Sequence, residues 1–191
     1  MRISLCTKST QRVAALAARR SLDKETAHQF SAKISRKVMR TPEFERARTI
    51  FSYQPFDDEA DVSLMNERAL RAGKRLAFPI CIEDGVMIAA IPHTSEDWDI
   101  GRYGIKSPIK ERSFILDPAD IDLVIVPCVA FEGRRRLRVG WGAGYYDRYL
   151  PLCENAVSIA IAYECQQIEN LCHDEWDVPP DQIITESNRY R

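Results

Sequence analysis

The stretch from Ile121 to Leu150 limits the possible folds of this chain more than any other. It contains an apolar, β-branched run, Leu123 to Pro127, which predicts a buried strand of a parallel or mixed sheet. Gly140, Gly142 and Gly144 follow, with alternate spacing that suits neither a strand nor a helix, and a helical pattern runs from Tyr145 to Leu150. Loops that leave buried parallel strands often carry ligands, so this stretch predicts a binding site.

The turn from Gly140 to Gly144 has the properties of an anion site. Glycine lacks Cβ and permits positive φ, so consecutive N–H groups can turn toward one anion. The turn would also bring its ligand to a helix N-terminus, and an arginine-dense loop precedes it, with Arg134, Arg135, Arg136 and Arg138. A polyphosphate is the expected ligand. The spacing matches neither of the common glycine-rich phosphate motifs, and the alternative is a tight turn beside solvated arginines.

Asp147 lies in the first turn of the predicted helix, where a carboxylate has two uses. It can cap the helix, or it can hold a divalent cation against bound phosphates, because Mg²⁺ takes one or two protein carboxylates together with phosphate oxygens.

The order of these parts resembles the signature of the 5-formyltetrahydrofolate cyclo-ligase family. That signature has a strand ending in proline, a Phe-acidic pair and then Arg-Leu-Gly-x-Gly-x-Gly-Tyr-Tyr-Asp. In this chain the pair is Phe131 and Glu132, and the motif reads Arg138, Val139, Gly140, Trp141, Gly142, Ala143, Gly144, Tyr145, Tyr146, Asp147. Val139 replaces the leucine, Ala143 stands where glycine or lysine is common, and Ser107 stands where the family usually has an acidic residue.

The resemblance extends to both ends of the chain. Lys8 and Arg12 are four residues apart and share one face of a predicted helix, as in the Lys-x-x-x-Arg helix that begins these enzymes. Glu59 matches a carboxylate that contacts the pterin, although a charge near a helix N-terminus would explain it without function. Asp177 matches a magnesium-binding aspartate, with Trp176 in place of a histidine; read alone, it is a turn former.

The resemblance implies a ligase that converts 5-formyltetrahydrofolate to 5,10-methenyltetrahydrofolate with ATP and Mg²⁺. Arg138 and Lys8 would be catalytic, and Asp147 and Asp177 would bind the metal. The implied ATP-binding residues are Lys8, Arg12, Arg138, Val139, Gly140, Trp141, Gly142, Ala143, Gly144, Tyr145 and Tyr146. The implied folate-binding residues are Arg12, Tyr53, Glu59, Trp141, Gly142, Ala143, Gly144 and Tyr145.

Strands expected near residues 49, 76, 86, 123, 157 and 183, interleaved with helices, predict an α/β/α three-layer domain with a mixed, mostly parallel sheet. The resemblance implies a fold similar to the sugar-phosphate isomerase and CoA-transferase superfamily. Between Lys8 and Met39 we predict two helices, the first with Val13, Leu16 and Ala17 on its apolar face.

Composition predicts a single soluble domain. The length of 191 residues suits one domain, 1–191, and 27 basic against 28 acidic residues leave no global field to attract nucleic acid or a membrane surface. The six cysteines, among them Cys6, form no C-x-x-C pair and are expected to be free thiols in the cytoplasm. We expect a monomer whose partners are its small-molecule substrates.

Two other functions fit parts of the sequence. One is a non-catalytic folate or nucleotide sensor, which Val139, Ala143 and Ser107 would explain. The other is a single-stranded RNA-binding module that uses the arginines before the glycine turn together with Trp141 and Tyr145.

Overall fold

The computed structural model describes residues 7–191, and its central feature is an eight-stranded sheet within those residues. The strand order is β12-β11-β10-β7-β1-β2-β3-β6. The parallel centre consists of β11 (Gln182–Ile184), β10 (Val157–Ile161), β7 (Leu123–Pro127), β1 (Thr49–Phe51) and β2 (Arg75–Cys81). Antiparallel strands extend it at both edges, namely β12 (Arg189–Tyr190), β3 (Met87–Pro92) and β6 (Ser113–Leu116). The predicted mixed, mostly parallel sheet is confirmed.

Two small antiparallel hairpins stand outside this sheet. One pairs β4 (Trp98–Ile100) with β5 (Lys106–Pro108), and the other pairs β8 (Ala130–Glu132) with β9 (Leu137–Val139). Short 3₁₀ turns connect several elements: η1 (Glu83–Gly85), η2 (Arg102–Gly104), η3 (Lys110–Arg112), η4 (Pro118–Asp120), η5 (Leu150–Leu152) and η6 (Glu164–Gln166).

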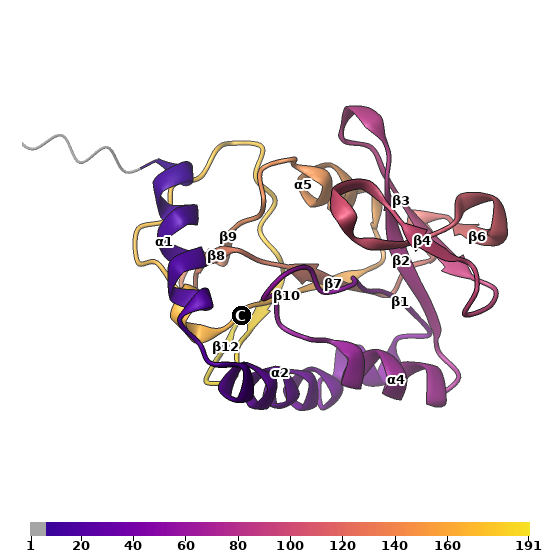
Figure 1. Cartoon of the computed structure of the whole chain (residues 1–191), viewed down its shortest axis with the longest axis horizontal. Coiled ribbons are helices and arrows are strands. Elements are labelled where there is room, and N and C mark those ends of the chain that lie inside the picture. The colour runs from indigo at the N-terminus through magenta and orange to yellow at the C-terminus, as the bar shows by residue number, and fades with distance from the viewer. Residues whose placement is uncertain (1–6) are drawn as a thin grey trace, which may run out of the picture.

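Helices cover both faces of the sheet, which gives three layers (Figure 1). On one face lie α2 (Lys24–Met39), α3 (Pro42–Arg46) and α4 (Ser63–Arg71). On the other face lies α5 (Tyr145–Tyr149), while α1 (Lys8–Arg20) stands at the side and packs against β8 and η6. Among the described residues, no helix is long and apolar enough to cross a membrane.

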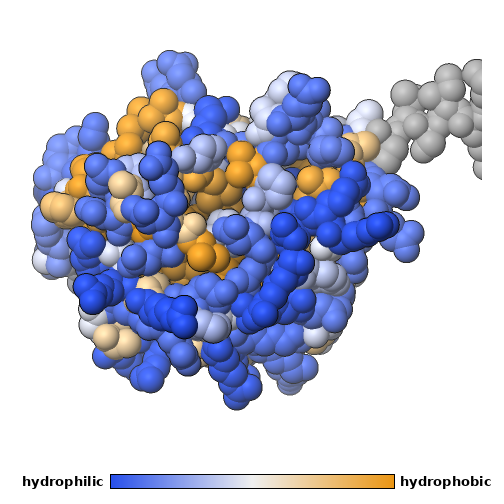
Figure 2. Space-filling view, turned by 180° about the vertical axis from the view of Figure 1, so that it is seen from behind, coloured by the Kyte–Doolittle hydropathy of each residue, from blue (hydrophilic) through white to orange (hydrophobic). Residues whose placement is uncertain are grey.

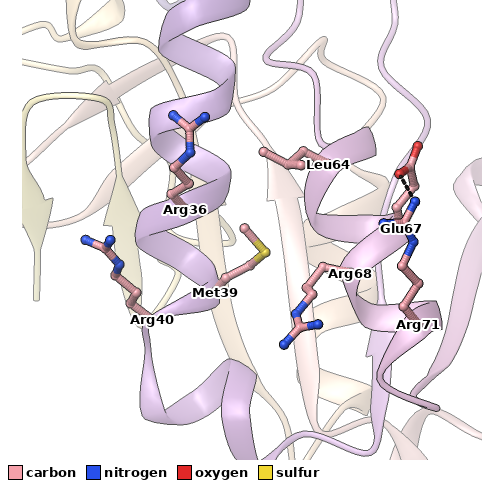
Figure 3. A pocket seen from close by; sticks show the side chains of 7 residues that line it. All are labelled: Arg36, Met39, Arg40, Leu64, Glu67, Arg68 and Arg71. Atoms are coloured by element: carbon pink, nitrogen blue, oxygen red, sulfur yellow. Dashed lines mark hydrogen bonds and ion pairs between the residues drawn. The ribbon is translucent and has the colours of Figure 1, made fainter.

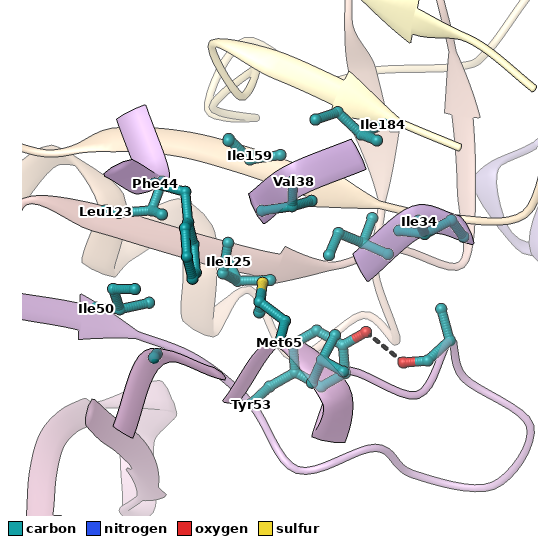
Figure 4. Close-up of a cluster of buried hydrophobic side chains, with 14 of the residues drawn as sticks. Ile34, Val38, Phe44, Ile50, Tyr53, Met65, Leu123, Ile125, Ile159 and Ile184 are labelled. Atoms are coloured by element: carbon teal, nitrogen blue, oxygen red, sulfur yellow. Dashed lines mark hydrogen bonds between the residues drawn. The ribbon is translucent and has the colours of Figure 1, made fainter. Parts of the chain in front are cut away.

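Successive residues of the central strands supply the cores of opposite faces. Ile50, Leu123 and Ile125 pack with Val38, Phe44 and Met65 under α2, α3 and α4 (Figure 4). Phe51, Val124 and Val126 point the other way and pack with Tyr149 and Leu150. Because side chains alternate along a strand, a run that is buried on both faces is apolar throughout, as the sequence of β7 is.

Seen from behind, hydrophobic residues also gather in the middle of one outer face, among hydrophilic ones (Figure 2).

Polar caps explain where α2 and α3 begin on the first face. The Asp23 carboxylate accepts the Thr26 N–H at 2.9 Å, and the Thr41 hydroxyl accepts the Phe44 N–H at 3.1 Å. Each bond satisfies an N–H that a helix leaves unpaired in its first turn. Thr41 precedes Pro42, whose ring suits the first helical position.

Two local predictions were wrong. The arginine-dense segment is not a loop throughout: Arg134, Arg135 and Arg136 lie in the turn of the β8–β9 hairpin, whereas Arg138 lies on β9 and is buried. The buried face of α1 is not the predicted apolar one: Val13 is 65% exposed, and Gln11, Ala15 and Arg19 face inward instead. Gln11 is buried because its side chain bonds the Asn170 carbonyl and the Cys172 N–H. Tertiary hydrogen bonds therefore outweigh hydrophobic periodicity in this helix.

The cysteines within residues 7–191 form no disulfides, as predicted. Cys81, Cys128, Cys153, Cys165 and Cys172 are free thiols, and Cys6 lies outside the described residues.

Candidate active site

The glycine turn joins β9 to α5 and needs glycine at two of its positions. Gly142 has φ of 106° and Gly144 has φ of 68°, both in the region that side chains disfavour. A Cβ on Gly144 would lie 2.8 Å from Arg148 Nη1, and one on Gly142 would lie 3.4 Å from Arg12 Nη2. The helix that follows has only five residues, so contacts to an anion would come from turn amides and nearby cations more than from a helix dipole.

Arg138 reaches the turn from β9. Arg138 is 6% exposed. Its guanidinium lies over the Tyr146 ring at 5.8 Å, and its Nη2 donates to Asp147 Oδ1 at 2.8 Å. Its buried Nε has no hydrogen-bond partner among residues 7–191. A buried charged donor without a partner is costly, and an anion bound at the turn would satisfy it.

Asp147 and the segment of Asp177, which are far apart in sequence, lie side by side in the structure. Asp147 Oδ1 also accepts the N–H of Val178, the residue after Asp177, at 3.2 Å. Asp177 Oδ2 accepts the Asp174 N–H at 2.8 Å and the Lys8 ammonium. The two aspartates that the sequence could not place relative to each other therefore belong to one cluster.

Helix α1 supplies two cations to this cluster. Lys8 Nζ donates to Asp174 at 2.7 Å and also pairs with Asp177. Burial works to lower the pKa of Lys8, but its hydrogen bonds to Asp174 and Asp177 outweigh burial, and the pKa is raised. One turn later, Arg12 Nε donates to the Gly140 carbonyl at 2.8 Å. The predicted pairing of Lys8 and Arg12 on one helix face is confirmed.

Glu59 lies on the other side of the glycine turn. Trp141 Nε1 donates to Glu59 Oε1 at 2.9 Å, and the Phe56 N–H donates to Oε2 at 3.0 Å. Burial raises the pKa of the Glu59 carboxyl, although these two hydrogen bonds work against the rise. The carboxylate expected at the pterin is thus joined directly to the turn expected at the phosphates.

The tyrosines differ in their surroundings. The Tyr145 hydroxyl donates to the Ile82 carbonyl at 3.1 Å, and its hydrogen bond with Tyr103 together with burial raises its pKa to about 12. Burial also raises the pKa of Tyr146, whose hydroxyl has no partner among the described residues. Tyr53 is 3% exposed and donates to the Ala60 carbonyl at 2.7 Å, so its side chain belongs to the core behind Glu59.

The three departures from the family signature lie in different surroundings. Val139 packs with Ala15 and Leu137 in a small core cluster. The Ala143 carbonyl accepts from Arg148, and the Ser107 hydroxyl donates to the Pro79 carbonyl at 2.9 Å.

The donor set fits Mg²⁺ that arrives with a polyphosphate. Among the described residues, no group of three or more His, Cys, Asp or Glu side chains could hold a metal alone. Asp147 and Asp177 supply carboxylate oxygens, and Mg²⁺ commonly completes its coordination with phosphate oxygens and water.

Sequence reasoning missed Arg19 and Asp58. Arg19 is 1% exposed, and its Nε donates to Asp58 Oδ1 at 2.7 Å. No motif marks either residue. Arg19 lies four residues after Ala15 and eight after Gln11, so the three residues share one helix face. That spacing is the signal that could have revealed Arg19.

A separate pocket of about 310 Å³ lies between α2 and α4, on the opposite face of the sheet (Figure 3). It is lined by Arg36, Met39, Arg40, Leu64, Glu67, Arg68 and Arg71. None of the residues implied for ATP, folate or metal lines it.

A mixed, mostly parallel sheet covered on both faces, with a glycine turn, cations and two carboxylates gathered at one place, is typical of an α/β enzyme that acts on phosphate-bearing substrates. Residues 5–186 match the model of the 5-formyltetrahydrofolate cyclo-ligase family, and the chain belongs to that family.

Individual relatives agree with this assignment. The chain is 29% identical over 173 residues to 5-formyltetrahydrofolate cyclo-ligase of Escherichia coli (strain K12), covering 88% of this chain and 94% of the relative. Among solved structures, 5,10-methenyltetrahydrofolate synthetase of Aquifex aeolicus matches with a TM-score of 0.84 and 31% identity, covering 96% of this chain and 92% of that one. The Mycoplasma pneumoniae 5,10-methenyltetrahydrofolate synthetase matches with a TM-score of 0.78 and 28% identity, over 95% and 99% of the two chains.

Proposed function

We propose that this chain converts 5-formyltetrahydrofolate to 5,10-methenyltetrahydrofolate with ATP and Mg²⁺, releasing ADP and phosphate. One observation carries the proposal beyond family membership: Asp147 Oδ1 accepts hydrogen bonds from both Arg138 Nη2 and the Val178 N–H. This contact places the segment of Asp177 beside the glycine turn, and Lys8 of α1 pairs with Asp177, so cations and carboxylates gather there as transfer of a phosphoryl group requires.

The phosphate end of the site uses charge and alignment. The amides of Gly140 to Gly144 surround the phosphates, and Lys8 and Arg12 neutralise them from α1. Arg138 is the cation closest to Asp147 and stabilises the charge that develops on the transferred group. Such a transfer depends on positioning and electrostatic stabilisation more than on covalent chemistry by the protein.

Asp147 and Asp177 would hold Mg²⁺ in this site. The ion, when bound, neutralises phosphate oxygens and polarises the group that is transferred. Both carboxylates now pair with cations, so their ion pairs must rearrange when the metal and nucleotide bind.

The folate end is formed by Glu59, Trp141 and Tyr145, with the amides of Gly142 to Gly144 shared between the two substrates. Glu59 accepts hydrogen bonds from the pterin as a carboxylate. Tyr53 supports this wall from the core and Tyr146 packs beside Arg138.

The reaction balances without a redox partner or a covalent enzyme intermediate. The γ-phosphoryl group passes from ATP to the formyl oxygen and ADP leaves, which turns a poor electrophile into an activated carbon. N10 attacks that carbon and loses its proton, the carbon–oxygen bond breaks, and inorganic phosphate leaves. The formyl carbon is then bonded to N5 and N10.

Absorbance of 5,10-methenyltetrahydrofolate, measured with ATP and Mg²⁺, tests the proposal. We expect product from the parent chain and severe loss in Arg138→Ala and Asp147→Ala. Nucleotide binding without product would favour the sensor that Val139, Ala143 and Ser107 suggest.

The remaining attributes complete the proposal. Residues 1–191 act as a single cyclo-ligase-like domain, monomeric and cytoplasmic, with no nucleic acid or membrane partner. Supporting observations are the burial of Arg138 and the ion pair of Arg135 with Glu132, which leave no continuous arginine stripe for single-stranded RNA.

A further inference from the structure

We propose that Arg19 is a positioning residue for the folate substrate, because it holds Asp58 and Trp141 and thereby orients the Glu59 carboxylate. The inference rests on the proposed function, which assigns Glu59 to the pterin.

Arg19 is a buried cation in an unusual place. Its side chain is 1% exposed, it pairs with Asp58 through Nε at 2.7 Å and through Nη2, and its Nη1 has no hydrogen-bond partner among residues 7–191. Removing a guanidinium from water is expensive, and one carboxylate does not satisfy all five of its N–H groups. A methionine or leucine would fill the same helix face at lower cost. The charge therefore has a use other than packing.

The guanidinium also fixes the Trp141 ring. Its Cζ lies 5.5 Å from the ring centroid, within the range of a cation–π contact, and the Phe56 ring meets Trp141 edge-on at 5.6 Å. Trp141 is 42% exposed, so these two contacts replace the burial that would otherwise hold its ring.

Both oxygens of Glu59 depend on this arrangement. Oε1 accepts Trp141 Nε1 at 2.9 Å, and Oε2 accepts the N–H of Phe56, which itself packs on Trp141. Asp58, the direct partner of Arg19, precedes Glu59 in the chain, so Arg19 also holds the backbone that carries the carboxylate. One cation on α1 thus controls the side chain and the backbone of Glu59.

Arg20 provides a matched control. It pairs with Asp57 at 3.1 Å and with Asp58 at 3.7 Å, in the same loop, and it is exposed. The Arg19 guanidinium lies over the Trp141 ring. If the effect of replacing Arg19 came from a general weakening of the loop, replacing Arg20 would share it, whereas loss of Glu59 orientation would follow from Arg19 alone.

The test compares Arg19→Met, Arg19→Lys and Arg20→Met in steady-state kinetics, with thermal melting to confirm folding. Arg19→Met should raise KM for 5-formyltetrahydrofolate by about tenfold or more, as expected when a charge-assisted hydrogen bond loses its geometry, and should leave KM for ATP at the parent's value. Arg19→Lys keeps a cation near Asp58 and Trp141 and should recover most of the loss. Arg20→Met should match the parent.

An equal rise in both KM values, a fall in kcat alone, or equal effects in Arg20→Met would overturn the inference. If Arg19→Met does not fold, Trp141→Phe takes its place, since it keeps the ring and removes the Nε1 donor; an unchanged folate KM in that variant contradicts the inference. Calorimetric binding of 5-formyltetrahydrofolate without ATP separates the two proposals. A parent that binds folate without turnover contradicts the proposed function, while weaker binding by Arg19→Met still supports the inference.

Discussion

Arg138 Nη2 lies 2.8 Å from Asp147 Oδ1, and the pair joins a cation proposed for phosphate to a carboxylate proposed for metal. Lys8 and Asp177 form a second pair of the same kind. Each pair keeps two charges neutral in a partly buried cluster. Binding of Mg²⁺ with ATP would exchange these internal pairs for pairs with the ligands, which makes the binding of metal and nucleotide interdependent.

Asp147→Asn should retain the fold and lose metal-dependent activity. The amide oxygen can still accept from Arg138 and from the Val178 N–H, but it cannot supply a negative charge to Mg²⁺. We expect the Mg²⁺ concentration for half-maximal rate to rise by at least about 10- to 100-fold, since even residues that only orient a metal ligand have effects of that size. A magnesium titration of the initial rate measures it. Asp174→Asn is the control, and an unchanged magnesium requirement in Asp147→Asn would remove the metal assignment.

Lys8→Gln should separate metal binding from nucleotide binding. Asp174 and Asp177 lose their ammonium partner, so Mg²⁺ alone should bind more tightly than to the parent. ATP with Mg²⁺ should bind more weakly, because a cation that contacts phosphate is gone. Titration calorimetry with each ligand measures both changes. Lys33→Gln on α2 is the control, and the idea of exchanged ion pairs fails if Lys8→Gln leaves both affinities unchanged.

Protonation of Glu59 should give the pH profile of kcat/KM for folate an acidic limb. Its pKa is raised by burial, and the carboxylate is the form that accepts hydrogen bonds from folate, so kcat/KM for folate should fall as pH drops through the raised pKa. The midpoint should lie above the ordinary glutamate value of about 4.3. Glu59→Gln should be slow at all pH values and lack the limb.

Other groups face Glu59, and their contributions can be separated. They are Arg19, Asp58, Tyr53, Tyr146 and Cys128. The two tyrosines and Cys128 have pKa values raised by burial, so they stay neutral throughout the acidic range. Asp58→Asn tests the remaining carboxylate and should keep the limb; a limb that persists in Glu59→Gln would assign it elsewhere.

Thr41→Ala should lower stability without changing the site. The Thr41 hydroxyl accepts the Phe44 N–H and donates to the Val38 carbonyl at 2.7 Å, and the residue is 1% exposed. Losing such a cap costs about 1 kcal/mol of unfolding free energy. Urea unfolding measures the change, and Thr41→Ser should recover most of it. Equal stability of Thr41→Ala and the parent would show that the cap contributes nothing.

Features with a local cause could be predicted from the sequence. The β-branched run of β7 is buried on both faces, Asp23 and Thr41 begin their helices, and the glycines of the turn at Gly142 and Gly144 adopt positive φ. Each depends on residues within a few positions along the chain, which is where periodicity and capping rules act.

Features that depend on distant contacts could not be predicted. The inward face of α1 is set by partners of Gln11 and Arg19 more than 35 residues away, and a hydrophobic pattern carries no information about them. The meeting of Asp147 with the segment after Asp177 likewise requires the parallel pairing of β7 with β10 and of β10 with β11.

A crystal structure with a non-hydrolysable ATP analogue, Mg²⁺ and 5-formyltetrahydrofolate tests the central claim most directly. We expect the phosphates to lie against the amides of Gly140 to Gly144, with Lys8 and Arg138 turned from their aspartates toward them and the pterin beside Glu59. Nucleotide bound elsewhere, for example among the arginines between α2 and α4, with the Arg138–Asp147 pair intact and the glycine turn bare, would contradict it.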